Sequence, residues 1–171
     1  MTELPPLELL KARLHYDPES GDFTWRENAN SRARQGDVAG TNCNGYIRIS
    51  VRGTLFAAHR LAVLYVTGLP PTDTIDHIDG NGLNNRYSNL RVCAHRENLR
   101  NQKKPASNTS GFKGVTYSKT KRKWLARVIL GRKVILVGKF TAPEAAARAY
   151  DDAAVKHFGE FAKTNKMLGL L

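Results

Sequence analysis

An aspartate and a histidine stand side by side in TIDHIDGNGLNNRYSNLRVCAHRENLRN, which runs from Thr74 to Asn101. Asp76 offers an anionic oxygen for a hard divalent cation, and histidine, here His77, is the side-chain type whose ordinary pKa suits a general base near pH 7. Asn98 offers an amide oxygen for the same cation, and Asn89 could accept the ring N–H of His77 and fix its tautomer. These residues predict metal-assisted hydrolysis in which a base activates water.

Neighbouring side chains of a regular strand point to opposite faces, so Asp76 and His77 reach one site only where a strand ends or bends. The turn-forming run IDGNGLNN predicts that end. The segment NLRVC then predicts a short strand opened by Asn89, and HRENLRNQ predicts the helix that follows it. The asparagines expected to build the loop are Asn81, Asn84 and Asn85.

The chain of 171 residues is strongly basic, because 27 Lys and Arg against 15 Asp and Glu give a formal net charge of +12. Such an excess favours nucleic acid or an anionic membrane surface as the partner. The longest apolar run, at residues 57–70, contains charged side chains and is far too short to span a bilayer. We therefore expect nucleic acid, whose phosphodiester bonds would be the substrate.

The N-terminal stretch MTELPPLELLKARL lacks the apolar core of a signal peptide. We expect an intracellular protein, in the cytoplasm of a bacterial or phage-infected cell, that is not secreted and has no membrane partner. Cys43 and Cys93 belong to no CxxC pair and lie among strand-like residues. They are interpreted as small buried thiols, so the sequence predicts no structural zinc.

The positive charge is unevenly distributed, since nine Lys or Arg and no acidic residue occur between Lys113 and Lys139. Before this stretch, QKKPASNTSG has the Pro, Ser, Asn and Gly typical of a linker. We expect a catalytic domain at residues 1–104, a linker at 105–110 and a basic domain at 111–171.

Periodicity predicts the elements that position the Asp76–His77 pair. Leucines at helical spacing from Leu7 predict a short opening helix. Residues 46–51 and 54–57 alternate and predict a hairpin that turns at Arg52-Gly53. The run HRLAVLYVTG predicts a helix that ends at Gly68.

In the basic domain three strand-like runs, GFKGVTYSK, KWLARVIL and KVILVGKF, precede the helical TAPEAAARAYDDAAVKHFG. Thr141 is expected to cap that helix and Gly159 to end it. Arg127 is expected to point away from the helix. The strand residues expected to face it are Trp124, Ala126 and Val128. The helix residues expected to face the sheet are Ala146, Ala149, Tyr150, Ala153 and His157.

The residues from Asp76 to Asn98 resemble the HNH nuclease family in its phage and intron-homing branch, with 12 residues from His77 to Asn89 and 9 from there to Asn98. The likeness extends upstream over GYIRISVRGTLFAAHRLAVLYVTG. It implies an α+β fold with a ββα-metal (His-Me finger) unit and His77 as general base, oriented by Asn89. It also implies one Mg²⁺ or Mn²⁺ ion held by Asp76 and Asn98. The zinc-bound subclass has CxxC pairs that this sequence lacks.

Residues Gly111 to Asn165 resemble the plant ethylene-response-factor (APETALA-type) DNA-binding domain in FKGV, KWLARV, VGKF, PEAAARAYDDAA and TN. The resemblance implies a three-stranded antiparallel sheet that packs on one helix and lies in the major groove. Leu136 stands where that domain has a DNA-contacting tryptophan, and Ile129 stands where it has an outward arginine. The sequence preference of the plant domain is therefore not carried over.

DNA contacts are expected from both domains. The arginines expected to hold phosphates beside the metal motif are Arg91, Arg96 and Arg100. The basic-domain residues expected to bind DNA are Lys113, Lys121, Arg122, Lys123, Arg127, Arg132, Lys133 and Lys139. Two further polar residues are interpreted as structural, His59 at a helix start and Asp79 in an Asp-Gly turn. His95 is interpreted as a helix cap or a contact to the DNA backbone.

The sequence thus predicts a metal-dependent, homing-type endonuclease of a phage or mobile element. It would cleave double-stranded DNA as a monomer or weak dimer, nicking one strand per site. The alternative is a catalytically degenerate nuclease that binds DNA as a transcription regulator. A third class is an RNA-directed or structural nucleic-acid protein.

Overall fold

The computed structural model describes residues 3–31, 33–94, 108–131 and 133–171. The chain divides into two compact units, Met1–Ala94 and His95–Leu171, each with its own apolar core. The domain boundary predicted after residue 104 and the helix predicted for HRENLRNQ both lie outside the described residues.

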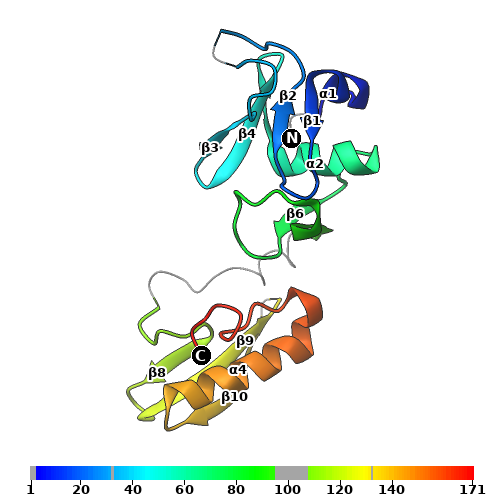
Figure 1. Ribbon diagram of the computed structural model, residues 1–171. Coiled ribbons are helices and arrows are strands. Elements are labelled where there is room, and N and C mark those ends of the chain that lie inside the picture. The colour runs from blue at the N-terminus through cyan, green and yellow to red at the C-terminus, as the bar shows by residue number, and fades with distance from the viewer. Residues whose placement is uncertain (1–2, 32, 95–107, 132) are drawn as a thin grey trace. The chain divides into compact units, whose positions relative to one another are not determined.

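The first unit is built from short helices and antiparallel strands (Figure 1). In its sheets β1 pairs with β2, β4 pairs with β3 on one side and β5 on the other, and β6 pairs with β7. Its elements are α1 (Leu7–Arg13), β1 (Leu14–Tyr16), β2 (Phe23–Trp25), β3 (Thr41–Cys43), β4 (Tyr46–Val51), β5 (Thr54–Ala57), α2 (Ala58–Thr67), β6 (Thr74–His77), the 3-10 turn η1 (Tyr87–Asn89) and β7 (Leu90–Cys93).

The hairpin and second helix of this unit form where the sequence predicts them. Arg52 and Gly53 turn the chain with positive φ angles of 49° and 81°, which a two-residue hairpin turn requires. Helix α2 then buries Leu61 and Leu64 in the core. It ends at Gly68, whose φ of 74° is the left-handed conformation that glycine adopts without strain.

The second unit consists of one sheet and one long helix, and the sheet order is β10-β9-β8 with every pair antiparallel (Figure 1). The predicted sheet of three strands and its helix are confirmed, as is the α+β class of the chain. No helix within the described ranges is long and apolar enough to cross a membrane. The elements are β8 (Val115–Ser118), β9 (Lys123–Leu130), β10 (Lys133–Phe140), α4 (Pro143–Phe158) and the 3-10 turn η3 (Gly159–Phe161).

The core of the second unit lies between α4 and one face of the sheet. Ala126 and Val128 face the helix and Arg127 is exposed, as predicted. The predicted helix stripe is partly wrong, because His157 is exposed. The buried positions of α4 are Ala146, Ala147, Tyr150, Asp151, Ala154 and Phe158.

The start of α4 also differs from the prediction. Ala142, not Thr141, occupies the N-cap position, with extended angles of φ −113° and ψ 142° and no side-chain hydrogen bond. The reason is Pro143, which takes the first helical position and keeps the residue before it out of the helical region.

Candidate active site

Asp76 and His77 lie at the C-terminal end of β6, and both side chains are buried. The chain turns immediately afterwards, with the Gly80 N–H donating to the His77 carbonyl at 2.8 Å. The strand end predicted between the two isoleucines therefore exists. The strand predicted to begin at Asn89 begins at Leu90 instead, because Asn89 ends the 3-10 turn η1.

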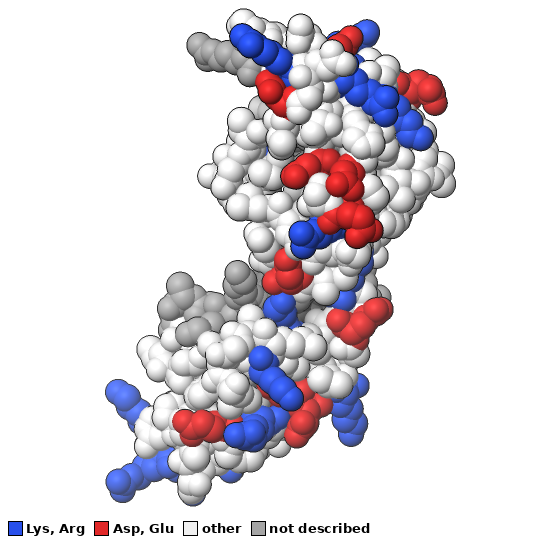
Figure 2. Space-filling view, in the orientation of Figure 1, with Lys and Arg blue, Asp and Glu red and all other residues white. Residues whose placement is uncertain are grey.

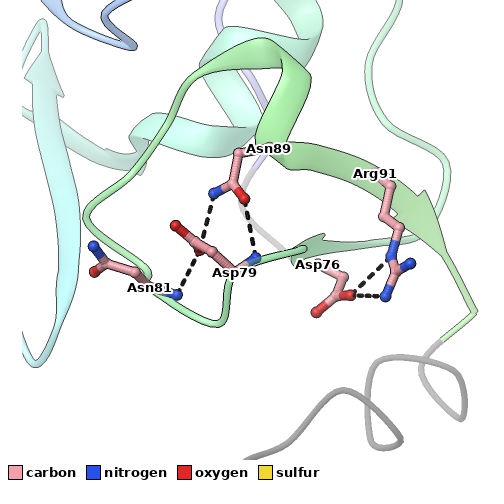
Figure 3. A network of polar contacts seen from close by, with 5 residues as sticks. All are labelled: Asp76, Asp79, Asn81, Asn89 and Arg91. Atoms are coloured by element: carbon pink, nitrogen blue, oxygen red, sulfur yellow. Dashed lines mark hydrogen bonds and ion pairs between the residues drawn. The ribbon is translucent and has the colours of Figure 1, made fainter. Parts of the chain in front are cut away.

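Asp76 is paired with an arginine on the neighbouring strand. Asp76 on β6 lies opposite Arg91 on β7, and the Nε and Nη2 atoms of Arg91 approach Asp76 Oδ2 at 2.9 and 2.6 Å (Figure 3). A buried carboxylate needs such a partner, since burial of an unpaired charge is very costly. Arg91, predicted to hold a phosphate, thus directs its guanidinium to the predicted metal ligand.

The ring of His77 is oriented by Asn85. The His77 Nε2 and Asn85 Oδ1 atoms lie 3.3 Å apart. Because an amide oxygen only accepts hydrogen bonds, this contact requires a proton on Nε2, which leaves the lone pair of the neutral ring on Nδ1. The contact with Asn85 therefore favours the tautomer of His77 that is protonated on Nε2.

Asn85 is itself held in place by the first hairpin, which consists of strands β1 and β2 and the turn between them. The Tyr16 hydroxyl donates to the backbone carbonyl of Asn85 at 2.7 Å. The Tyr87 N–H donates to the Pro18 carbonyl at 3.1 Å. A Cβ atom at Gly21 would overlap the backbone of the loop at Asn85, so glycine permits the close approach of hairpin and loop.

Asn89 secures the loop rather than the histidine. Its amide oxygen accepts the Asp79 N–H at 3.0 Å, and its amide nitrogen donates to Asp79 Oδ1 at 3.0 Å (Figure 3). The same amide nitrogen donates to the Asn84 carbonyl at 2.8 Å. The predicted hydrogen bond from the His77 ring to Asn89 is therefore wrong. Asn85, which was predicted only to build the loop, also contacts the His77 ring.

Asp79 is the centre of the loop's hydrogen bonds. Burial raises the pKa of its carboxyl, but the Asn81 N–H and the amides of Asn84 and Asn89 outweigh that effect and lower the pKa overall. Its predicted part in the Asp-Gly turn agrees with these contacts. The turn is stabilised in the ionised form of Asp79.

An aromatic cluster lies beside His77. The rings of His59 and His77 are perpendicular, with centroids 5.1 Å apart, and Tyr46 contacts both rings at 5.8 and 5.9 Å. Burial, together with the nearby His77 and two arginines, lowers the pKa of His59 to about 4. The Nδ1 atom of His59 is buried without a hydrogen-bond partner among the described residues. His59 is thus neutral near pH 7 and restricts the plane of the His77 ring.

The described residues fit a divalent cation in chemical character. Asp76 supplies a buried carboxylate, and carboxylate oxygens are ligands that Mg²⁺ prefers. A bound ion would compete with Arg91 for this carboxylate. Asn98, the second predicted ligand, lies outside the described residues. Within the described residues no group of three or more His, Cys, Asp or Glu side chains could hold a metal ion.

The predicted DNA-binding residues of the second unit differ in exposure. Lys113 is half-buried, and burial together with the nearby Lys163 lowers its pKa to about 8, although Asp151 opposes that shift. Lys123 is also half-buried. The exposed residues of the set are Lys121, Arg122, Arg127, Lys133 and Lys139. The predicted contacts that fall outside the described residues are Arg96, Arg100 and Arg132.

Basic side chains of this unit come mainly from its strands and turns. Figure 2 shows acidic and basic side chains mixed over the visible side of the second unit. All four acids of residues 108–171 belong to α4 or η3: Glu144, Asp151, Asp152 and Glu160. The stretch that builds the sheet therefore carries only positive charge.

Comparison with known proteins identifies the segment that contains the site. Residues 56–100 match a family model described as HNH endonuclease. The predicted resemblance to the HNH family is confirmed for this segment. The match includes β6, β7 and the loop between them, together with all four residues predicted for the HNH chemistry.

Relatives of this chain occur in viruses. Protein 3.8 of Escherichia phage T7 is 48% identical over 60 residues, which are 35% of this chain and 50% of that protein. The uncharacterized HNH endonuclease L560 of Acanthamoeba polyphaga mimivirus is 35% identical over 111 residues, which are 64% of this chain and 57% of that protein. The chain thus spans about half the length of these relatives.

A solved structure and a plant protein complete the comparison. The structure, titled DNA binding and cleavage by the HNH homing endonuclease I-HmuI, aligns with a TM-score of 0.42 and 23% identity over 59% of this chain and 57% of that one. The C-terminal region is similar to APETALA2-like protein 2 of Oryza sativa subsp. indica, 47% identical over 62 residues, or 35% of this chain and 14% of that protein.

Two residues beside the HNH motif were not predicted to take part in the site. Asn85 was assigned to the loop, and nothing in the spacing of the asparagines distinguishes it from Asn84 or Asn81. Tyr16 lies 69 residues from Asn85, so only the folded chain brings the two together.

Proposed function

We propose that this protein is a metal-dependent endonuclease that hydrolyses phosphodiester bonds of double-stranded DNA. The observation that carries the proposal is the buried Asp76–His77 pair at the end of β6, inside the segment that matches the HNH endonuclease family. The net charge of +12 supports a polyanionic substrate.

His77 is the general base. The contact between its Nε2 atom and Asn85 orients the ring, which takes the proton of the attacking water. The neutral His59 ring, perpendicular to it, limits rotation of the His77 ring. Asn89 and Asp79 act indirectly, because they fix the loop from which Asn85 extends.

One divalent ion, Mg²⁺ or Mn²⁺, would be held by Asp76 and Asn98. When bound, such an ion supplies positive charge for the scissile phosphate and the leaving oxygen. Arg91 holds the Asp76 carboxylate in position and keeps its charge compensated. No structural zinc is proposed.

The second unit positions the enzyme on DNA through the exposed cations of its sheet. We assign catalysis to residues 1–104, a linking role to 105–110 and DNA binding to 111–171. One HNH site attacks one strand, so a monomer nicks and a double-strand break requires a weak dimer or a second event. A homing-type enzyme of a phage or mobile element that acts inside the cell fits these assignments.

The decisive test is nicking of supercoiled plasmid in Mg²⁺ or Mn²⁺ by the wild type and by His77→Ala. We expect the variant to lose about 10²–10⁴-fold in rate, the usual contribution of a general base, while a gel shift still shows DNA binding. His157→Ala is the matched control, because His157 is exposed on α4. Normal cleavage by His77→Ala would show that another residue is the base.

A non-catalytic DNA-binding regulator is the second candidate. The ion pair favours it, since the Arg91 guanidinium approaches Asp76 Oδ2 with two nitrogens and a metal would compete with that contact. Wild-type protein that shifts DNA on a gel but nicks it with neither metal would establish this candidate. Preference for single-stranded RNA in competition would contradict both.

The role of the sheet is tested by the salt dependence of DNA binding. Lys121→Ala and Lys133→Ala should each remove one phosphate contact. The magnitude of the slope of log binding constant against log salt concentration should therefore fall by about one in each variant. Lys156→Ala on α4 is the matched control. An unchanged slope in the two sheet variants would contradict the assignment of DNA binding to the sheet.

A further inference from the structure

The sheet of the second unit has a face that α4 does not cover. Ala126 and Val128 on β9 pack against the helix. Because side chains alternate between the two faces along a strand, Arg127 and Ile129 lie on the opposite face. Cross-strand partners share a face. In β10 the partner of Arg127 is Leu136, the partner of Ile129 is Val134, and Lys139 lies opposite Leu125 on the same side.

Three aliphatic side chains are exposed together on this face. Ile129 is 62% exposed, its cross-strand partner Val134 is 60% exposed, and Leu136 is 46% exposed. The exposed cations Arg127 and Lys139 flank them along the strands. We call these five residues the outer face. Large aliphatic side chains gathered on a surface are a common mark of a binding site.

The charge around the outer face indicates the class of its partner. Nine Lys or Arg and no acid lie between Lys113 and Lys139, so a polyanion is favoured and a basic protein surface is disfavoured. The partner must also offer apolar groups to the three aliphatic side chains. The major groove of DNA offers both, because phosphates line it and each thymine exposes a methyl group there.

Uracil in RNA has no such methyl group, and the major groove of an RNA helix is too deep and narrow for a sheet to enter. Double-stranded DNA that contains thymine therefore fits the outer face better than RNA.

We propose that the outer face reads thymine methyl groups in the major groove, with Ile129, Val134 and Leu136 as the specificity-determining contacts. Arg127 and Lys139 contact the flanking phosphates. This inference rests on the proposed function of the sheet in binding duplex DNA and adds a preference for thymine-containing sites to it.

The experiment compares two duplex pools of identical random sequence, one synthesised with thymidine and one with deoxyuridine. The substitution removes only the methyl group. The full-length His77→Ala protein is used, so that cleavage does not disturb the binding measurement. We expect the deoxyuridine pool to bind about fourfold more weakly for each thymine methyl group that the outer face would otherwise cover.

Variants locate the discrimination on the sheet. Ile129→Thr and Val134→Thr keep β-branched residues suited to a strand but introduce a hydroxyl into the apolar contact. Each variant should bring the ratio of the affinities for the thymidine and deoxyuridine pools closer to one. Val155→Thr is the matched control, since Val155 is 52% exposed on α4, away from the sheet. This control should retain the full ratio.

The outcomes separate the two levels of the proposal. Equal and tight binding of both pools overturns thymine reading and leaves DNA binding by the sheet standing. Binding of neither pool overturns both. A ratio that persists in Ile129→Thr and Val134→Thr also overturns the assignment to the outer face. A third result would also overturn it: sedimentation shows a wild-type dimer, both variants are monomers, and both still prefer the thymidine pool. The outer face would then join two copies of the chain.

Discussion

The candidate active site of the first unit and the outer face of the second unit depart from the usual distribution of side chains in opposite directions. The first unit buries polar side chains, namely Asp76, His77, Asn85 and Asn89, at one end of a short sheet. The second unit exposes aliphatic side chains on the outer face of its sheet. Buried polar groups and exposed apolar clusters are the two informative departures in a folded protein. The difference suits the two proposed roles, because catalysis is favoured in an environment shielded from water and recognition needs an accessible surface.

Burial of polar groups alone does not mark catalysis, and the second unit shows why. Asn165 is fully buried there, and its amide accepts the Lys113 N–H at 2.7 Å and donates to the Lys113 carbonyl at 3.2 Å. It also donates to Asp151 Oδ1 at 2.8 Å. This network joins the C-terminal segment to the helix and to the start of the sheet.

The largest expected effect tests whether the Asn165 network is structural. Asn165→Ala should lower the free energy of unfolding by about 2–4 kcal/mol, because it removes the hydrogen bonds that the buried Asn165 amide makes with Lys113 and Asp151. Urea unfolding followed by tryptophan fluorescence measures the loss, with Trp124 as the reporter of the second unit. The neighbouring exposed residue provides the control, Lys166→Ala. A loss no greater than that of the control would mean that Asn165 does not hold the unit together.

The next effect tests whether buried Asn85 serves catalysis. Asn85→Ala removes the contact that fixes the His77 tautomer, so the cleavage rate should fall by about 10–100-fold, as it does when a residue that orients a catalytic histidine is removed. Asn81→Ala is the control, since Asn81 bonds to Leu83 in the same loop without contacting the ring. Comparable rates for the two variants, measured by plasmid nicking, would remove Asn85 from the site.

A smaller effect concerns pH. Because the pKa of His59 falls from 6.5 to about 4 on folding, the unfolded chain takes up its proton first. The stabilisation that neutral His59 provides is complete above pH 6.5 and is lost as the pH falls toward 4.

His59→Phe keeps the ring packing and removes this titration, so its melting temperature should fall less between pH 6.5 and 4 than that of the wild type. Thermal unfolding across this range measures the difference. The control is His157→Phe at an exposed position. If wild type and His59→Phe show parallel pH profiles, His59 is not buried in its neutral form.

The smallest effect tests whether the outer face is a surface rather than a core. Val134→Thr should change the free energy of unfolding by less than about 0.5 kcal/mol, since Val134 is exposed and has no role in the core. Urea unfolding measures it alongside Val128→Thr, which places a hydroxyl in the core and should be clearly destabilising. Similar losses in both variants would show that the outer face is covered.

Much of the architecture could be predicted from the sequence because it depends on local patterns. The alternation in residues 46–51 and 54–57 and the glycine at position 68 define elements by short-range geometry. The position of Asp76 and His77 at a strand end followed from the turn residues after them. Such patterns need no knowledge of distant contacts.

The roles of individual asparagines could not be predicted in the same way. Which amide reaches the His77 ring depends on the path of residues 78–86, and that path depends on contacts with the first hairpin. The pairing of Asp76 with Arg91 likewise depends on the register of β6 and β7. Each of these contacts joins residues well separated in the chain, which spacing alone does not specify.

The glycine at position 21 has a consequence for any attempt to transplant this site. The segment matching the HNH family begins at residue 56, but the loop that carries Asn85 rests on the backbone near Gly21 and on the Tyr16 hydroxyl. A chimera assembled from residues 56–100 alone would keep every residue of the motif and lose the surface that shapes its loop. A fragment that keeps the shape of this loop therefore has to start upstream of Leu14, where the first hairpin begins.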